Sequence, residues 1–467
     1  MRRIITLFAI IITFSSSAEE ARSPEDQALL GVIEVNRHAK RVCSGVFLSG
    51  RTAGDILRQD HGVEATDYAV GVNRVAGWVR LSSVTTTSTA VYRPGLGCTL
   101  LYGLTAEELR KQATGNLSPR VLDSAVAWPR GSKVEVMTPE GLDRGALTRA
   151  LDRAFSEPDP DNRQGSRAAI VMYDGQIVGE RYAPGFAPDR PLIIWSMTKS
   201  LTNALVGLLV KDGVIDHRSP ASVPEWHKTD DPRAAITLDQ LLRMSSGLKF
   251  DEIYTGGLID VTISLFGDPS SAHYAAKQPL AFQPDEKWAY SSGTTNIVAR
   301  LVRDSLGGEL DDYVTFARAR LFNPLGMSDT VIELDEAGTF VGSSFGYSTP
   351  RDLARFGLML LQDGVWEGKR LLPAGWVRYS TEPTPKAPNG VYGAHFWLNA
   401  GEPSDPAKRA MPNVPADGYW MSGYEGQTVM MVPSRQAVIG RLGRTPPGNR
   451  FSMDRFISEI LSALPPS

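Results

Sequence analysis

The stretch that follows Trp195 places the strongest constraint on the fold of this chain. Apolar residues recur there at the spacing of one helix face, at Leu201, Ala204, Leu205, Leu208 and Leu209. Gly213 stands just beyond them, where a glycine commonly ends a helix. The pattern therefore predicts a helix that begins at Ser196 and packs one face into a core.

Ser196 and Lys199 are three residues apart, so they share a face at the start of this helix. A serine hydroxyl is a weak nucleophile until a neighbouring group takes its proton. A lysine takes that proton only where burial or nearby positive charge lowers its pKa. The free backbone amides at a helix start also suit a developing oxyanion. Ser-x-x-Lys alone is common by chance, and on its own it is more often an ordinary serine at a helix start beside a solvated lysine.

Strand patterns stand on both sides of a mostly helical stretch. Residues 168–182 read as a β-hairpin around the Asp174-Gly175 turn, and residues 427–432 and 437–442 read as strands. A serine-capped helix is predicted over residues 452–464. We therefore expect an α/β (α+β) fold, in which both ends of the segment form one antiparallel sheet flanked by helices, with a helical subdomain inserted between them.

The part of the chain before this sheet reads as an accessory region. Residues 24–130 are rich in β-branched and apolar residues, which indicates strands, and they contain no constellation around a nucleophile. A Pro/Asp/Gly-rich linker lies at 156–165. The predicted boundaries are 1–18 for a signal peptide, 19–155 for a β-rich N-terminal accessory region and 156–467 for the domain that carries Ser196.

The first residues have the three parts of a secretory signal. Met1-Arg2-Arg3 is basic, residues 4–14 are apolar, and small residues follow up to Ala18. The apolar run is short for a membrane span, so we expect a periplasmic or secreted protein with no membrane span. With 49 basic and 52 acidic residues and no basic cluster, nucleic-acid binding is not expected.

The chain contains two cysteines, Cys43 and Cys98. Export to an oxidising compartment favours a disulfide between them, and two buried free thiols are the alternative. The six histidines are scattered, without an H-x-x-x-H pair or any other ligand spacing, so neither a metal site nor a cofactor is predicted.

Three further segments carry candidate site residues. Tyr290-Ser291-Ser292 precedes a predicted helix, and a tyrosine beside a serine and lysine pair relays a proton as a phenolate or through its hydroxyl. Residues 241–248 read as a helix end that runs into a Ser-Gly turn. Residues 422–427 form a glycine-rich turn before a strand, where glycines let the chain approach a substrate closely.

In order and spacing these segments resemble the serine hydrolases of the class C β-lactamase and DD-peptidase superfamily, from about residue 167 to the C-terminus. The matches are Ser-x-x-Lys at 196–199, Leu-Leu-x-x-x-Ser-Gly-Leu at 241–248, Tyr-Ser-Ser at 290–292 and Gly-Tyr-Ser-Thr-x-x-Asp-Leu-x-x-Phe-Gly at 346–357. The Tyr-Ser-Ser form and Tyr254 are most similar to the 6-aminohexanoate-dimer (nylon oligomer) hydrolase branch and related esterases. The resemblance implies a β-lactamase-like fold.

The resemblance also implies roles for individual residues. Ser196 would be the acylated nucleophile, Lys199 its base, and Tyr290 the group that moves a proton to and from the leaving group. The oxyanion hole would consist of the backbone N–H groups of Ser196 and Gln427. Candidate substrate contacts are Tyr254, Ser292 and Tyr424.

One segment departs from the pattern of the superfamily. Its third motif, Lys-Thr-Gly or His-x-Gly, reads Tyr424-Glu425-Gly426 here. A tyrosine keeps a hydrogen-bond donor but has no charge for a substrate carboxylate, and Glu425 opposes an anion if it faces the site. We therefore expect a small-molecule ester or amide substrate without the carboxylate of D-Ala-D-Ala or a β-lactam, and weak or absent β-lactamase activity.

Several alternatives remain open at this stage. A DD-peptidase or β-lactamase that acts on cell-wall peptides or β-lactams is one, and a non-catalytic penicillin-binding-like protein is another. Residues 342–346 also match Gly-x-Ser-x-Gly, the nucleophile elbow of α/β-hydrolases, with Ser344 as nucleophile and Asp352 and His395 as its partners. The sequence predicts neither the substrate, the role of the N-terminal region nor the oligomeric state.

Overall fold

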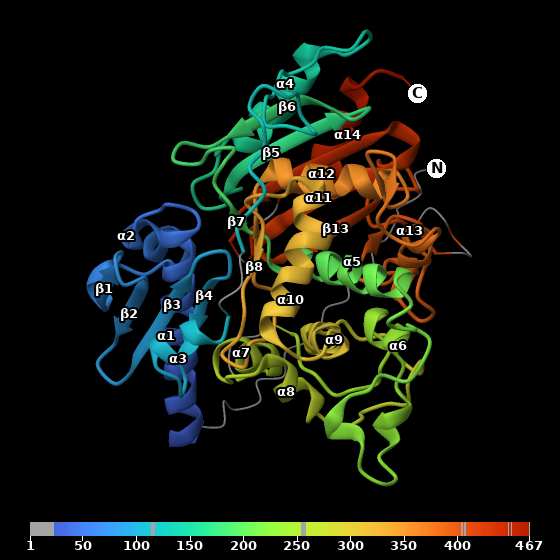
Figure 1. The fold of residues 1–467 in the computed structure, drawn as a ribbon. Helices are drawn as coiled ribbons and strands as arrows, with labels where there is room; N and C mark the ends of the chain where they lie inside the picture. The colour runs from blue at the N-terminus through green and yellow to red at the C-terminus, as the bar shows by residue number, and fades with distance from the viewer. Residues whose placement is uncertain are drawn as a thin grey trace, which may run out of the picture.

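A computed structural model shows a six-stranded antiparallel sheet between helices, with a smaller sheet of N-terminal residues beside it (Figure 1). It describes residues 23–113, 117–253, 258–402, 405, 408–446, 448–449 and 451–466. The predicted signal peptide at 1–18 and the candidate residue Tyr254 lie outside these ranges. Within them, no helix is both long and apolar enough to span a membrane.

The central sheet is formed from both ends of the second part of the chain, as predicted. Its strand order is β12-β13-β14-β15-β5-β6, and every neighbouring pair is antiparallel. The predicted hairpin is β5–β6, and β15 from near the C-terminus pairs with β5. The strands are β5 Ser166–Tyr173, β6 Gln176–Tyr182, β12 Trp397–Leu398, β13 Tyr419–Gly423, β14 Gln427–Val432 and β15 Ala437–Gly443.

Helices cover both faces of this sheet (Figure 1). Helices α4 (Arg144–Phe155) and α14 (Met453–Ala463) pack against each other, and their apolar side chains form one core with one face of the sheet. Helix α12 (Pro350–Leu361) contacts β5, β14 and β15 from the other core. Strands β14 and β15 are consequently buried at every position, which explains their continuous apolar pattern.

The predicted helix after Trp195 is present and lies at the centre of the molecule. A single 3₁₀ turn, η3 (Trp195–Met197), runs directly into α5 (Thr198–Lys211), and nearly all of α5 is buried. The helical subdomain that follows packs beside it. Its helices are α6 Leu238–Leu242, α7 Asp260–Phe266, α8 Ser271–Ala276, α9 Ser292–Ser305, α10 Leu310–Ala317 and α11 Asn323–Leu325.

A small sheet joins this helical subdomain to the turn before α5. Its order is β7 (Leu192–Ile193), β9 (Gly346–Ser348) and β8 (Val331–Ile332). The Gly346 amide donates a hydrogen bond of 2.9 Å to Thr198 Oγ1 at the start of α5. A Cβ atom at this glycine would lie 2.4 Å from that oxygen, so only glycine fits here. Two short strands and a helix lie further along the chain: β10 Val365–Trp366, β11 Lys369–Arg370 and α13 Trp376–Ser380.

The N-terminal region contains the predicted strands and also a long helix that was not predicted from the sequence. Helix α1 (Pro24–Phe47) is 24 residues long and packs on an antiparallel sheet of four strands. Its buried face carries Lys40 and Arg41 as well as apolar residues, so the apolar periodicity of a helix is interrupted. The other elements are α2 Ala53–Ile56, β1 Ala69–Asn73, β2 Trp78–Ser82, β3 Thr87–Arg93, β4 Gly97–Leu100 and α3 Ala106–Lys111.

Buried ion pairs attach the N-terminal region to the rest of the molecule. Lys40 on α1 pairs with Glu333, which also accepts a hydrogen bond of 2.6 Å from the Cys98 amide. Asp60 pairs with Arg167 on β5. Removing one partner of such a pair leaves an uncompensated buried charge, at a cost of about 3–5 kcal/mol.

Cys43 and Cys98 form a disulfide, as expected, with their Cα atoms 6.1 Å apart. The bond joins α1 to β4, and thus the long helix to the sheet on which it packs. In the chain-entropy description, a disulfide that closes a loop of about 55 residues stabilises the folded state by ~4 kcal/mol.

The double variant Cys43→Ser/Cys98→Ser should therefore unfold at a lower guanidinium concentration, with a loss of roughly 4 kcal/mol in unfolding free energy. Chemical denaturation followed by circular dichroism measures this change. Wild-type protein with reductant is the control, and its guanidinium midpoint should approach that of the variant. An unchanged midpoint in both samples would show that the bond does not stabilise the fold.

Candidate active site

The amino group of Lys199 is the centre of the candidate site. Its Nζ lies 3.0 Å from Ser196 Oγ, 3.0 Å from Ser292 Oγ and 3.1 Å from the carbonyl oxygen of Ser343. The side chain is 1% exposed. The turn η3, the start of α9 and the turn before β9 thus each place one group around the same nitrogen.

Burial lowers the pKa of Lys199 from its usual value to about 8, although the carboxylate of Glu252 acts in the opposite direction. Nζ donates hydrogen bonds to Ser196 Oγ, Ser292 Oγ and the Ser343 carbonyl, which match the three N–H donors of an ammonium. Because the pKa is lowered to about 8, the lysine loses this proton more readily than a lysine in water. The lone pair of the neutral amine can then accept the proton of Ser196.

The backbone immediately before Ser196 is held in an uncommon conformation. Trp195 has a φ of 48°, in the left-handed region that costs a residue with a side chain about 1–2 kcal/mol. Its indole ring is held between neighbours: the Arg41 guanidinium lies 4.8 Å from the ring centroid, and the Tyr424 ring lies 5.9 Å away. Packing around Trp195 therefore fixes the turn that presents Ser196.

Tyr290 lies beside both Lys199 and Ser196. Its ring centroid is 4.7 Å from Lys199 Nζ, and its hydroxyl interacts with Ser196. The ring packs against Tyr392 and Trp397, at centroid distances of 5.7 and 5.6 Å. Enclosure raises the pKa of Tyr290 well above its usual value, so the hydroxyl stays protonated and acts as a donor rather than as a phenolate.

Sequence reasoning missed Glu252, which extends the network beyond Ser292. The Ser292 hydroxyl donates a hydrogen bond of 2.5 Å to Glu252 Oε1, and the Ser292 amide donates one of 2.6 Å to Oε2. Ser292 is 1% exposed, and the structure places its hydroxyl between Glu252 and Lys199. Glu252 is forty residues away from Ser292 in the sequence, and no spacing pattern connects the two.

The third motif brings β14 beside the turn of Ser196. Glu425 and Gly426 have φ values of 63° and 82°, so the chain turns sharply before Gln427 begins β14. The Gln427 side chain bonds to the backbone of Tyr424 and Gly443, which leaves only its main chain to face the site. The backbone oxyanion hole of Ser196 and Gln427 stays a prediction.

The two side chains that replace the family's Lys-Thr differ in their surroundings. Tyr424 is 38% exposed at the rim of the site. Glu425 pairs with Arg444 at 3.2 Å, so its charge is compensated. At Gly423, a Cβ atom would lie 2.3 Å from the carbonyl oxygen of Ile194, which shows how closely β13 approaches the turn of Ser196.

The nucleophile-elbow alternative is wrong. Residues 342–344 form a turn that precedes strand β9, whereas an elbow requires a strand before the serine and a helix directly after it. Its proposed partners have other contacts. His395 bonds to the Lys199 carbonyl and to Thr295, and burial lowers its pKa to about 3. Asp352 pairs with Arg355.

A pocket of about 200 Å³ opens beside Ser196. One wall consists of apolar side chains of α7, Val261, Leu265 and Phe266. The facing wall is charged and comes in part from the N-terminal region. Its members are Arg37, Arg41, Asp60, His61, Tyr424, Glu425 and Arg444.

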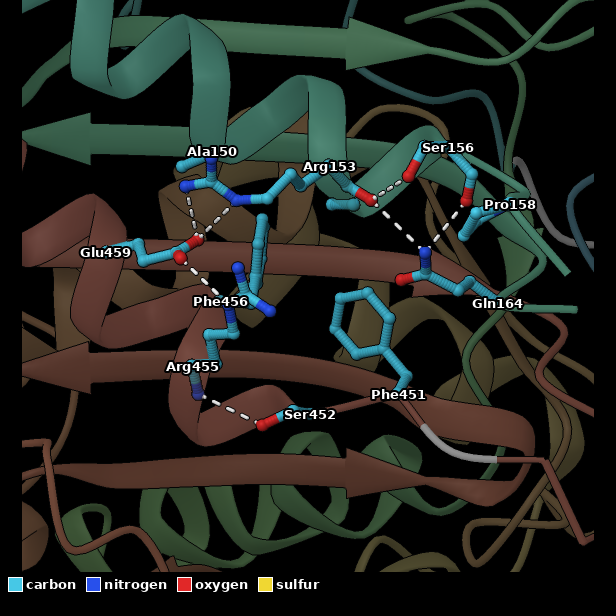
Figure 2. Close-up of a pocket in the computed structure, with 11 residues that line it drawn as sticks. Ala150, Arg153, Ser156, Pro158, Gln164, Phe451, Ser452, Arg455, Phe456 and Glu459 are labelled. Atoms are coloured by element: carbon cyan, nitrogen blue, oxygen red, sulfur yellow. Dashed lines mark hydrogen bonds and ion pairs between the residues drawn. The ribbon is translucent and has the colours of Figure 1, made fainter. Parts of the chain in front are cut away.

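A larger hollow, of about 420 Å³, lies between α4 and α14 (Figure 2). Its charged side chains pair with one another, since Glu459 binds both Arg153 and Arg455. Its serines support helix ends: Ser452 caps α14, and Ser156 bonds to the last turn of α4. These contacts account for the polar groups of the hollow, so it is not a candidate active site.

The second part of the chain is similar to known proteins. The family model described as Beta-lactamase matches residues 151–462. The 6-aminohexanoate-dimer hydrolase of Paenarthrobacter ureafaciens is 27% identical over 304 residues, which is 60% of this chain and 72% of that protein.

Two solved structures share the fold. A penicillin-binding protein homologue from Caulobacter crescentus has a TM-score of 0.53 at 18% identity, covering 71% of this chain and 100% of that one. A family VIII carboxylesterase has a TM-score of 0.53 at 16% identity, covering 71% and 99%. At sequence identities this low, the two structures show that the fold is shared and show nothing about activity.

The carboxylate of Glu252 favours the ammonium form of Lys199, so its removal should lower the pKa of Lys199 further below about 8. We expect Glu252→Gln to shift the Lys199 titration to lower pH in NMR of lysine labelled at Cε. Lys199→Met assigns the signal. A titration that moves upward, or does not move, would contradict the proposed coupling.

Proposed function

Because this chain belongs to the Beta-lactamase family of serine hydrolases, we propose that it is an exported enzyme that hydrolyses a small ester or amide through an acyl-enzyme at Ser196. The observation that supports this most strongly is the enclosed Lys199 amine, 3.0 Å from the Ser196 hydroxyl. Export is supported by the signal-like residues 1–18 and by the Cys43–Cys98 disulfide.

Acylation begins when the neutral Lys199 amine takes the proton of Ser196 and Oγ attacks the substrate carbonyl carbon. The negative charge that develops on the carbonyl oxygen is stabilised by the backbone amides of Ser196 and Gln427. As the bond to the leaving group breaks, the Tyr290 hydroxyl gives its proton to the departing oxygen or nitrogen. Lys199 then returns the proton to Tyr290, so both groups regain their starting states.

Deacylation uses the same groups in reverse order. A water molecule attacks the acyl carbon, and its proton passes to the neutral Lys199 amine, with the Tyr290 hydroxyl as a relay that accepts one proton as it gives up its own. The tetrahedral intermediate collapses, the bond to Ser196 Oγ breaks, and Oγ recovers the proton. The products are the free acid and the intact enzyme.

The proposal of an ester or amide substrate has two supports. The relative from P. ureafaciens is named as a hydrolase of 6-aminohexanoate dimer, and one structural neighbour is named as a carboxylesterase. The position of the family's lysine carries Tyr424, without the charge that would hold the carboxylate of a β-lactam or of D-Ala-D-Ala. A non-catalytic role is disfavoured because Ser196, Lys199 and Tyr290 occur together around one centre.

Ser196→Ala should lower the hydrolysis of p-nitrophenyl butyrate by about 10³-fold or more, because the nucleophile is lost. It should also abolish labelling by a fluorophosphonate probe. Release of p-nitrophenol and in-gel fluorescence measure the two effects. Ser344→Ala is the matched control and should keep the label. Loss of labelling in Ser344→Ala alone would refute the assignment of Ser196.

We expect the purified wild-type protein to hydrolyse nitrocefin slowly or not at all, since Tyr424 supplies no charge for its carboxylate. Absorbance of the opened β-lactam measures the rate, and the p-nitrophenyl ester serves as the positive control. Rapid nitrocefin turnover would favour the β-lactamase alternative, and turnover of a D-Ala-D-Ala peptide would favour the DD-peptidase.

A further inference from the structure

We propose that the N-terminal region completes the substrate pocket, and that Arg37 on α1 binds a carboxylate carried by the acyl part of the substrate. This inference rests on the proposed function and names its substrate class: esters or amides of short acids with a second, free carboxylate. The carboxylate excluded above is a different one, since it belongs to D-Ala-D-Ala or to a β-lactam.

Two side chains of α1 line the pocket, but only one is available to a ligand. Arg41 is buried, pairs with Asp60 at 3.1 Å and stacks on Trp195. Its charge and its hydrogen bonds are therefore used within the protein. Arg37 lies one turn earlier on the same helix and is exposed at the pocket.

The carboxylates around the pocket are already paired with other arginines. Asp60 binds Arg51 and Arg167 in addition to Arg41, and Glu425 binds Arg444. Among the side chains that line the pocket, three are arginines (Arg37, Arg41 and Arg444) and two are carboxylates (Asp60 and Glu425), so Arg37 gives the wall an excess of positive charge. The whole chain, in contrast, has a net charge of −3.

No carboxylate among the described residues forms an ion pair with Arg37. Glu34, one turn earlier on α1, accepts a hydrogen bond of 3.4 Å from Tyr68. The histidines near Arg37 add no charge, because burial lowers the pKa of both His38 and His61. An unpaired guanidinium at a pocket rim is suited to a carboxylate, which it binds through two parallel hydrogen bonds.

Arg37 lines the same pocket as Tyr424, the residue that stands where the family has its lysine. The positive charges of Arg37 and Arg444 both reach the Tyr424 hydroxyl and favour its ionised form, against burial and the charge of Glu425, which raise its pKa. The positive charge in this pocket thus comes from α1, a helix that precedes the hydrolase domain, and not from the third motif.

The pocket itself indicates which part of the substrate carries the carboxylate. Ser196 lines it together with the apolar wall of α7, whereas Tyr290, the proposed donor to the leaving group, is not among its lining residues. The group held in this pocket is therefore the acyl group. Methylene carbons would contact Val261 and Leu265, and the terminal carboxylate would reach Arg37.

Two esters of equal acyl length test this inference. Mono-p-nitrophenyl glutarate carries the free carboxylate, and p-nitrophenyl valerate carries a methyl group in its place. We expect wild-type protein to prefer the glutarate ester, and Arg37→Gln to lower the ratio of the two kcat/KM values about tenfold or more, mainly through KM. Arg37→Lys should restore part of the preference. Arg74→Gln removes an exposed arginine near β1 and should leave the ratio unchanged.

An unchanged ratio in Arg37→Gln, or an equal fall for both esters, would overturn the inference. Failure to hydrolyse either ester would instead refute the proposed function. The binding of glutarate to Ser196→Ala, measured by titration calorimetry with and without Arg37→Gln, then tests the subsite without catalysis. Binding that depends on Arg37 supports the subsite, and binding that does not depend on it, or is absent, overturns it.

Discussion

Burial of the Lys199 amine is the constraint on which the rest of the candidate site depends. In water a lysine carries its proton near neutral pH, and only enclosure brings the pKa down to about 8. That enclosure requires three separate segments to meet at one nitrogen: the turn η3, the start of α9 and the turn before β9. The helical subdomain and the small sheet of β7, β8 and β9 fix these segments in place.

The N-terminal region contributes to the same site, although it lies outside the hydrolase domain. Arg41 packs on Trp195, whose left-handed backbone sets the direction of Ser196. Arg41 is itself held by Asp60, and Asp60 is anchored to β5 through Arg167. A series of contacts between charged side chains thus connects the central sheet, through the N-terminal region, to the turn that carries the predicted nucleophile. A variant at Asp60 would affect both the attachment of the region and the geometry at Ser196.

Local sequence patterns were sufficient to predict part of this arrangement. The pair Ser196 and Lys199 follows from helical spacing, and the β5–β6 hairpin from alternation around an Asp-Gly turn. Helix α1 was missed because its buried face includes Lys40 and Arg41, whose partners lie elsewhere in the fold. Glu252 and the arginine-lined wall were missed for a related reason: their roles depend on distant residues that only the folded chain brings close.

The buried pair of Lys40 and Glu333 has a consequence for how the chain folds. The two residues are 293 positions apart in the sequence. During synthesis α1 emerges first, yet the carboxylate that neutralises its buried lysine emerges only when most of the chain has been made. Contacts of such long range form late, since a large loop must close before they stabilise anything. The contact between Lys40 and Glu333 is therefore among the later ones to form, although α1 already packs on the sheet next to it in the sequence, and the pocket that α1 borders is complete only after residues from the C-terminal part have joined it.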